Sequence, residues 1–126
     1  MIDNIKISTT DFDHERLLKD SSFNFSTKVN TETSEIIKNV HGNYKQEAFL
    51  HGLKIIVYQN HNNFMTLFIM GSIHKFFNNG AHNYNDFVYS DLVITIDRLS
   101  RLFYFDLNKC NIRNVEIGVN IKLSVK

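Results

Sequence analysis

The chain has 126 residues, 43% of them apolar, and a formal net charge of +1. This composition excludes a disordered chain, and the length predicts a single domain over residues 1–126. A net charge this close to zero does not by itself indicate a nucleic-acid partner. No apolar run approaches the roughly 20 residues of a membrane span, so we expect no membrane partner.

The first third of the chain predicts two strands, a short helix and a hairpin. Ile5 and Ile7 alternate in a first strand, and Thr10-x-x-Asp13 has the spacing of a capping box that would open a short helix. Residues 23–29 alternate apolar and polar side chains, which is typical of a half-buried strand. The turn after them predicts that residues 34–40 return as its hairpin partner.

The middle of the chain predicts two further strands. Residues 49–58 read as one strand interrupted by Gly52, where we expect a bulge. Residues 64–73 are apolar on both faces, with Phe68 and Met70 on one side and Leu67 and Ile69 on the other. This pattern suits a central strand that is covered on both sides, or one covered face together with a surface for a partner.

The last third predicts one long helix and one strand. An apolar stripe at i, i+4, i+7 and i+11 indicates a helix from Ser90 to Tyr104, with Ser90 as its N-cap. Residues 115–125 then alternate strictly, as in a strand with one buried face. Together these elements predict an α+β fold: one largely antiparallel sheet of about five or six strands, with one long and one short helix on one face.

Charge is unevenly distributed along the chain. Residues 1–37 hold seven acidic and four basic side chains, whereas residues 38–82 hold four lysines, five of the six histidines and one acid, Glu47. The middle of the chain is therefore its electropositive part. This pattern is typical of a solvated sheet face.

The stretch Gly71–Phe87 carries the densest run of candidate binding side chains. They combine cationic, aromatic and amide groups, which can contact phosphates and stack on unpaired bases. The candidates are His74, Lys75, Phe76, Asn78, Asn79, His82, Asn83 and Tyr84. The same residues also fit a loop that is anchored by buried phenylalanines and closed by bonds from asparagine to the backbone. Gly80 is expected at positive φ in a turn.

Catalytic chemistry has little support in the sequence. The best metal-binding or acid–base set is His74, His82 and Glu116, but no histidines stand at a tight ligand spacing. A Gly-x-Ser-x-Gly nucleophile motif is absent, and Cys110, the single cysteine, has no specified base beside it. We therefore predict a protein that is not an enzyme and that uses neither a metal nor another cofactor. The lone cysteine also fits a reducing compartment.

Three segments carry a resemblance to a known family. Gly71 to Phe87, Asp91-Leu92 and Asn114 to Ile121 resemble the N-terminal part of replication initiators of the filamentous-phage and plasmid type. That family nicks an origin and carries the cleaved strand on a tyrosine. No tyrosine of this sequence is followed by lysine at the third position, and no His-x-His pair exists. Because the sequence also ends soon after Glu116, the resemblance implies a binding half rather than a nickase.

A second resemblance concerns the chain as a whole. A short, non-catalytic protein from a mobile element is similar to the anti-CRISPR proteins expected of Bacteroidetes elements, such as inhibitors of the type VI-B RNA-guided nucleases. This implies a stoichiometric inhibitor in the bacterial cytoplasm whose partner is a CRISPR effector nuclease or its RNA complex. The alternative is a DNA-binding piece of a replication system, with single-stranded nucleic acid as its partner.

Overall fold

The computed structural model describes residues 2–27, 32, 44–60, 62, 64–82 and 86–117. These residues form five strands, three α-helices and one 3-10 helix. The strands are β1 (Ile2–Thr9), β2 (Tyr44–Leu50), β3 (Leu53–Gln59), β4 (Met65–Ser72) and β5 (Asn111–Ile117). The helices are α1 (His14–Lys19), α2 (Ile73–Phe77), α3 (Tyr89–Leu102) and the 3-10 helix η1 (Leu107–Lys109).

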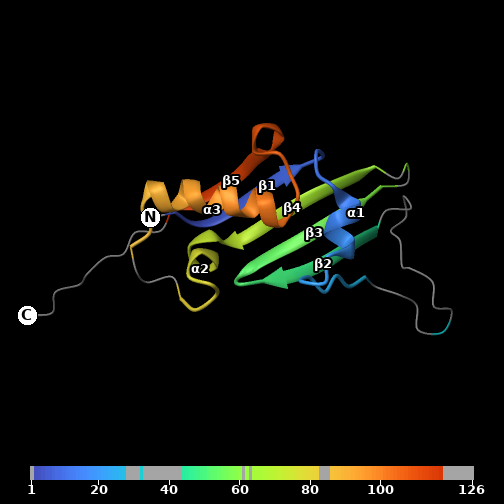
Figure 1. Cartoon of the computed structure of the whole chain (residues 1–126), viewed down its shortest axis with the longest axis horizontal. Helices are drawn as coiled ribbons and strands as arrows, with labels where there is room; N and C mark the ends of the chain where they lie inside the picture. The colour runs from blue at the N-terminus through green and yellow to red at the C-terminus, as the bar shows by residue number, and fades with distance from the viewer. Residues whose placement is uncertain are drawn as a thin grey trace, which may run out of the picture.

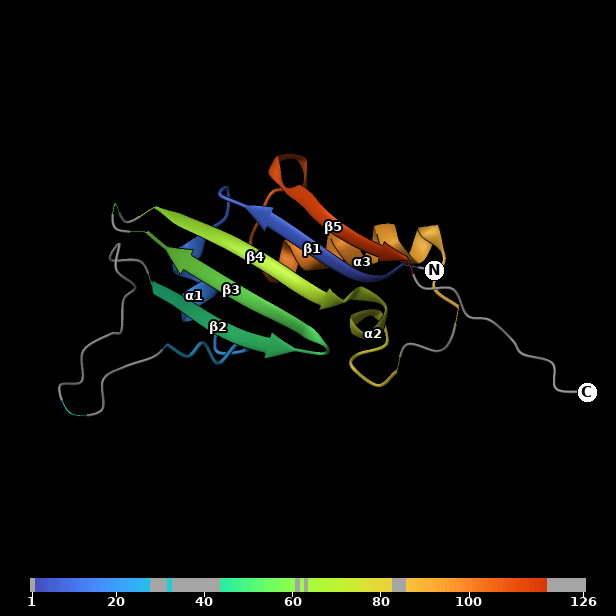
Figure 2. The ribbon, with the colours of Figure 1, turned by 180° about the vertical axis from the view of Figure 1, so that it is seen from behind.

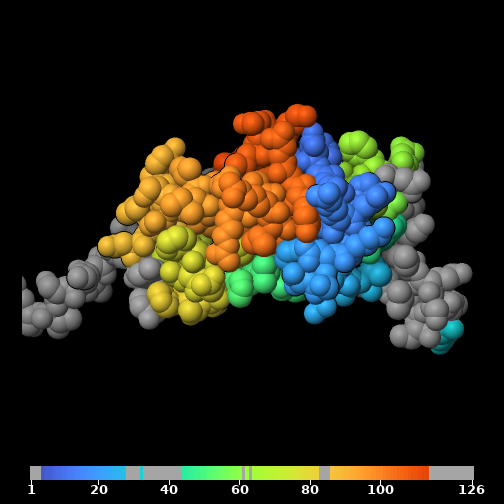
Figure 3. All heavy atoms as spheres, viewed as in Figure 1, coloured from blue at the N-terminus to red at the C-terminus, as the bar shows by residue number. Residues whose placement is uncertain are grey.

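The five strands form one antiparallel sheet in the order β2-β3-β4-β1-β5. Helices α1 and α3 lie on the same side of this sheet, while α2 follows β4 at one end of it (Figure 1). The space-filling view from the helix side shows that the helices and the N-terminal segment cover nearly all of this face (Figure 3). The predicted α+β class with a largely antiparallel sheet is confirmed.

The core lies between the sheet and the helices. Alternate side chains of the three central strands are fully buried on this side, and the helical layer adds Leu17, Leu99 and Phe103. The strand contribution consists of Ile5, Ile7, Leu53, Ile55, Val57, Leu67 and Ile69. Burying an aliphatic side chain contributes about 1.5–3 kcal/mol, so this contact supplies most of the driving force that docks α3.

Two contacts tie residues 20–23, which follow α1, to the end of α3. The Tyr104 hydroxyl donates to the Asp20 carboxylate over 2.7 Å, and the rings of Phe23 and Phe103 lie 5.0 Å apart. The hydrogen bond from Tyr104 is the main cause that lowers the pKa of Asp20. Tyr104 has a φ of 56°, so the backbone turns sharply after α3 and directs this side chain toward Asp20.

The structure corrects three predicted elements in the first half of the chain. The strand expected across Gly52 is a hairpin, because His51 and Gly52 form a two-residue turn with both φ angles positive. Residues 23–27 run beside β2 but make one isolated bridge, between Ser26 and Glu47, rather than a strand. Asp13, not Thr10, caps α1 by accepting from the Arg16 amide. The hairpin partner expected at residues 34–40 lies outside the described residues.

Two further differences concern the second half of the chain, and the last strand is described only in part. The stretch that follows β4 contains helix α2. Ser72 is the N-cap of this helix, and its side chain accepts a hydrogen bond from the Lys75 amide. Helix α3 begins at Tyr89, and the Asp91 carboxylate accepts from the Val88 amide, so Ser90 is not its N-cap. The last strand is described as far as Ile117, and the rest of its predicted span lies outside the described residues.

Replacing a core residue of α3 tests how much this packing contributes to stability. We expect Leu99→Ala to lower the free energy of unfolding by about 2–5 kcal/mol, because it removes a fully buried side chain and leaves a cavity. Ile94→Ala on the same helix is the control, since Ile94 is 62% exposed and should change stability by less than about 0.5 kcal/mol. Urea unfolding measures both, and equal effects would contradict the assignment of the core.

Candidate nucleic-acid interface

The predicted binding stretch at Gly71–Phe87 is only partly at the surface. His74 and Phe76 are fully buried in α2, and the His74 ring stacks on Phe87 at 4.9 Å. The amides serve local structure: the Asn78 side chain donates to the His82 carbonyl, and Asn79 accepts from Arg98. Of the two interpretations of this stretch, the anchored loop describes these residues better.

Lys75 and Asn79 are exposed among the members of the predicted set that the structure describes. The Lys75 side chain lies against Gly52 of the β2–β3 turn, and Gly80 lies against His51 of the same turn. Gly80 has the positive φ that was predicted, 83°. The Arg98 guanidinium covers the Phe76 ring at 5.0 Å. His82 is half-buried, and Asn83 and Tyr84 lie outside the described residues.

The side of the sheet that faces away from α1 and α3 has a different character. Seen from behind, the five strands are in view with no helix in front of them (Figure 2). We call this side the open face and define it by the strand positions that alternate with the buried ones. Among its described members are Lys6, Ser8, Lys45, Glu47, Phe49, Lys54, Ile56, Tyr58, Thr66, Phe68, Met70 and Arg113.

Strand register arranges the open face in rows across the strands. One row runs Phe49, Lys54, Met70 and Lys6. The next row runs Glu47, Ile56, Phe68 and Ser8, and a third runs Lys45, Tyr58 and Thr66. Directly opposed residues on one face lie about 4.5–5.5 Å apart at Cβ, so the members of a row are in contact range.

Each aromatic side chain of the open face stands beside a lysine. The Lys6 ammonium lies 5.4 Å from the centre of the Phe68 ring, and the Lys54 ammonium lies 6.0 Å from that of Phe49. Tyr58 is the register partner of Lys45. These distances are within the range of a cation–π contact. The open face therefore presents flat apolar rings and positive charge in alternation.

A β-bulge adds a further cation to this face. Lys6 pairs with Asn114 and Ile7 pairs with Ile112, which leaves Arg113 as the extra residue in β5. The bulge directs Arg113 to the open face, where its Nε donates to the Ser8 hydroxyl over 2.7 Å. Arg113 is exposed, so the rest of its guanidinium faces solvent.

Glu47 is the single carboxylate on the open face among the described side chains. It accepts from Lys45 at 2.9 Å and lies 3.6 Å from Lys54. The hydrogen bond from Lys45 is the largest influence on the pKa of Glu47 and lowers it, while partial burial opposes this effect. The nearby positive charges lower it further, so Glu47 is ionised at neutral pH and the face keeps a net positive charge.

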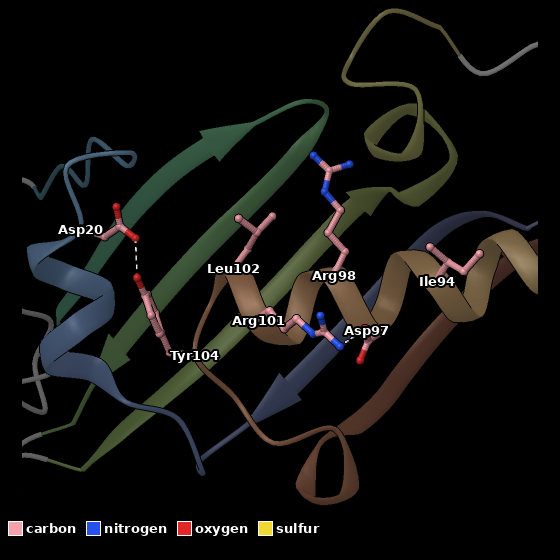
Figure 4. A pocket seen from close by; sticks show the side chains of 7 residues that line it. All are labelled: Asp20, Ile94, Asp97, Arg98, Arg101, Leu102 and Tyr104. Carbon is pink, nitrogen blue, oxygen red and sulfur yellow. Dashed lines mark hydrogen bonds and ion pairs between the residues drawn. The ribbon is translucent and has the colours of Figure 1, made fainter.

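The helix side carries a groove of about 470 Å³ beside α3, which Figure 4 shows. Its charged groups are of both signs and largely satisfied within the groove. Arg101 pairs with Asp97 at 3.1 Å, and Tyr104 holds Asp20. The side chain of Arg98 points away from Arg101, toward α2. The groove therefore has no net charge that would select one class of ligand, unlike the open face.

The described residues form neither a metal-binding cluster nor a helix that could span a membrane. No three His, Cys, Asp or Glu side chains in that part of the chain gather closely enough to hold a metal ion. No described helix combines the length and the apolar character that crossing a membrane requires. Of the acid–base set considered above, the Glu116 backbone pairs with Asn4, and its side chain lies outside the description.

Comparison with known proteins adds no assignment. No protein-family model, curated protein or solved structure matches this chain. The resemblances to replication initiators and to anti-CRISPR proteins therefore stay predictions. The sequence does not single out the open face, because its members belong to five separate strands. The signal that could have found it is the alternation of residues 54, 56 and 58 with the buried positions between them.

The ion pairs of Glu47 predict a pH-dependent contribution to stability. A carboxyl whose pKa is lower in the folded state stabilises the fold above its unfolded pKa, which is about 4.3 for glutamate. This contribution is lost as the pH falls through the folded pKa. We expect the free energy of unfolding of wild type to exceed that of Glu47→Gln by at most about 1 kcal/mol at pH 7. This difference should vanish in acid. Urea unfolding across this pH range checks it, and a pH-independent difference would contradict it.

Proposed function

We propose that this protein binds single-stranded nucleic acid on the open face of its sheet, and that single-stranded DNA is the form bound. The observation that carries the proposal is the placement of Phe49, Tyr58 and Phe68 on the sheet face that no described helix covers, each beside a lysine. The resemblance to replication initiators favours DNA over RNA.

The chemistry of this face matches an unpaired strand. Aromatic side chains stack on bases with about 1–3 kcal/mol per base, whatever the sequence, because every base has a flat π-surface. The neighbouring ammonium groups reach the phosphates that flank a stacked base. A duplex hides its base faces within the stack, so it would engage the cations alone. The open face should therefore prefer single strands.

The proposal is one of binding and includes no catalytic step. Anti-CRISPR inhibition is the first expectation from the sequence and strand binding is its alternative, but no contact among the described residues favours inhibition over strand binding. An inhibitor could use the same face against the RNA of an effector complex. In either role the protein would work in the cytoplasm of a bacterial host, which the single cysteine suits.

Truncating the central aromatic residue tests the proposal. We expect Phe68→Ala to raise the Kd for fluorescein-labelled oligo(dT) by about 5- to 150-fold, which corresponds to the loss of one stacked base. Fluorescence anisotropy measures the affinity, and circular dichroism verifies that the variant is folded. Wild-type affinity should fall with salt at a slope of about −0.7 for each phosphate contacted.

Controls separate the open face from the rest of the surface. Ile94→Ala removes an exposed apolar side chain from the helix side and should leave the Kd unchanged. A hairpin duplex of the same length should bind more weakly than oligo(dT). Wild-type protein that binds neither oligo(dT) nor oligo(rU) would refute the proposal. If oligo(rU) binds more tightly than oligo(dT), the ligand of the open face is RNA and not DNA.

A further inference from the structure

We propose, on the basis of the strand-binding function above, that the open face holds three unequal nucleotide subsites and that Glu47 makes them unequal. Each subsite consists of one ring and its adjacent lysine. The subsites are Phe68 with Lys6, Phe49 with Lys54, and Tyr58 with Lys45. Glu47 weakens the second and third because it holds both of their lysines.

The register sets the spacing of the three rings. Phe68 and Tyr58 stand on adjacent strands and one row apart, since Ile56 pairs with Phe68. Neighbouring strands are about 4.8 Å apart and successive side chains on one face about 6.8 Å, which separates the two Cα atoms by about 8 Å. Phe49 lies two strands and one row from Phe68, at about 12 Å. Three rings at these separations can each take a different base of one short strand.

The Phe68 subsite differs from the others in its electrostatics. Within the described residues, Lys6 lies within 4 Å of no carboxylate, whereas Lys45 and Lys54 both contact Glu47. A phosphate that approaches Lys45 or Lys54 must displace this carboxylate or accept its repulsion. A phosphate at Lys6 meets neither cost. The strand is therefore anchored at Phe68 and Lys6, and the other two subsites add less.

Glu47 also lies where it can weaken both the Phe49 subsite and the Tyr58 subsite. It stands in the row of Phe68 and Ile56, while Lys54 and Phe49 lie in the row on one side of it and Lys45 and Tyr58 in the row on the other. Its side chain is 23% exposed, so a bound strand would pass close to it. Removing this charge should release two lysines at once.

Glu47→Gln tests the inference directly. We expect it to tighten oligo(dT) binding by about 2- to 30-fold, the range of two partly exposed ion pairs. The salt dependence should steepen by about 0.7, because the face gains one unit of positive charge. In a series from dT₂ to dT₈, the gain should be complete once three nucleotides are present. Anisotropy measures all of these quantities.

Asp97→Asn is the matched control. Asp97 is also an exposed carboxylate in an ion pair, with Arg101, but it lies on α3 on the helix side of the sheet. Both substitutions raise the net charge by one, so an effect of total charge would appear equally in both. We expect Asp97→Asn to leave the affinity for oligo(dT) within about twofold of wild type, since charges on the far side are screened beyond about 10 Å.

A double-mutant cycle distinguishes the subsites. Lys6→Ala should weaken binding more than Lys54→Ala in wild-type protein, and the loss from Lys54→Ala should grow in the Glu47→Gln background. Wild type that binds oligo(dT) while Glu47→Gln leaves its affinity unchanged would overturn the inference and leave the proposed function standing. Equal gains from Glu47→Gln and Asp97→Asn would overturn it as well. Absence of any binding by wild type would instead remove the proposed function itself.

Discussion

The fold depends on the contact between one face of the central strands and a single helical layer. Ile55, Ile69 and Ile7 lie on neighbouring strands at fully buried positions, and Leu99 of α3 is buried with them in the same core. Because side chains alternate along a strand, fixing these residues inward commits their neighbours to the opposite side. The described helices that follow the strands lie on the same side or at the end of the sheet, so those neighbours form a continuous surface (Figures 1 and 2).

A sheet face without a helix must remain compatible with water. Here the ammonium groups of Lys6 and Lys54 lie over the rings of Phe68 and Phe49, so charged groups stand between these rings and water. Ile56 and Met70 are half-buried, although no described helix lies over this face. The arrangement that keeps the face soluble is also the one that recognises a strand of bases and phosphates. Solubility of the face and recognition of a strand favour the same residues, so lysines and aromatic rings alternate closely on it.

The sequence predicted the fold class and the long helix well, because both follow from apolar periodicity. It predicted less well where the outcome depends on tertiary contacts. The turn at His51 and Gly52 and the helix that begins at Ile73 are not marked by apolar periodicity, and Gly80 lies against His51 although the two are far apart in the chain. His74 looked like a surface ligand because it is polar, yet it stacks on Phe87 in the interior. Periodicity alone could not show which sheet face the helices cover.

Tertiary contacts also explain why the polar residues that stand out in the sequence, between Gly71 and Phe87, are not the ones that form the candidate site. The asparagines after α2 stand out in the sequence, but the Asn78 amide closes a turn and Asn79 holds Arg98 over Phe76. Their polar groups are largely occupied by the protein itself. By contrast, the open-face residues are ordinary strand residues taken singly, and they become a site when antiparallel register brings five strands together. The affinity of such a site depends on the pairing between strands, so a one-residue slip of β2 would turn Glu47 and Lys45 to the opposite side of the sheet.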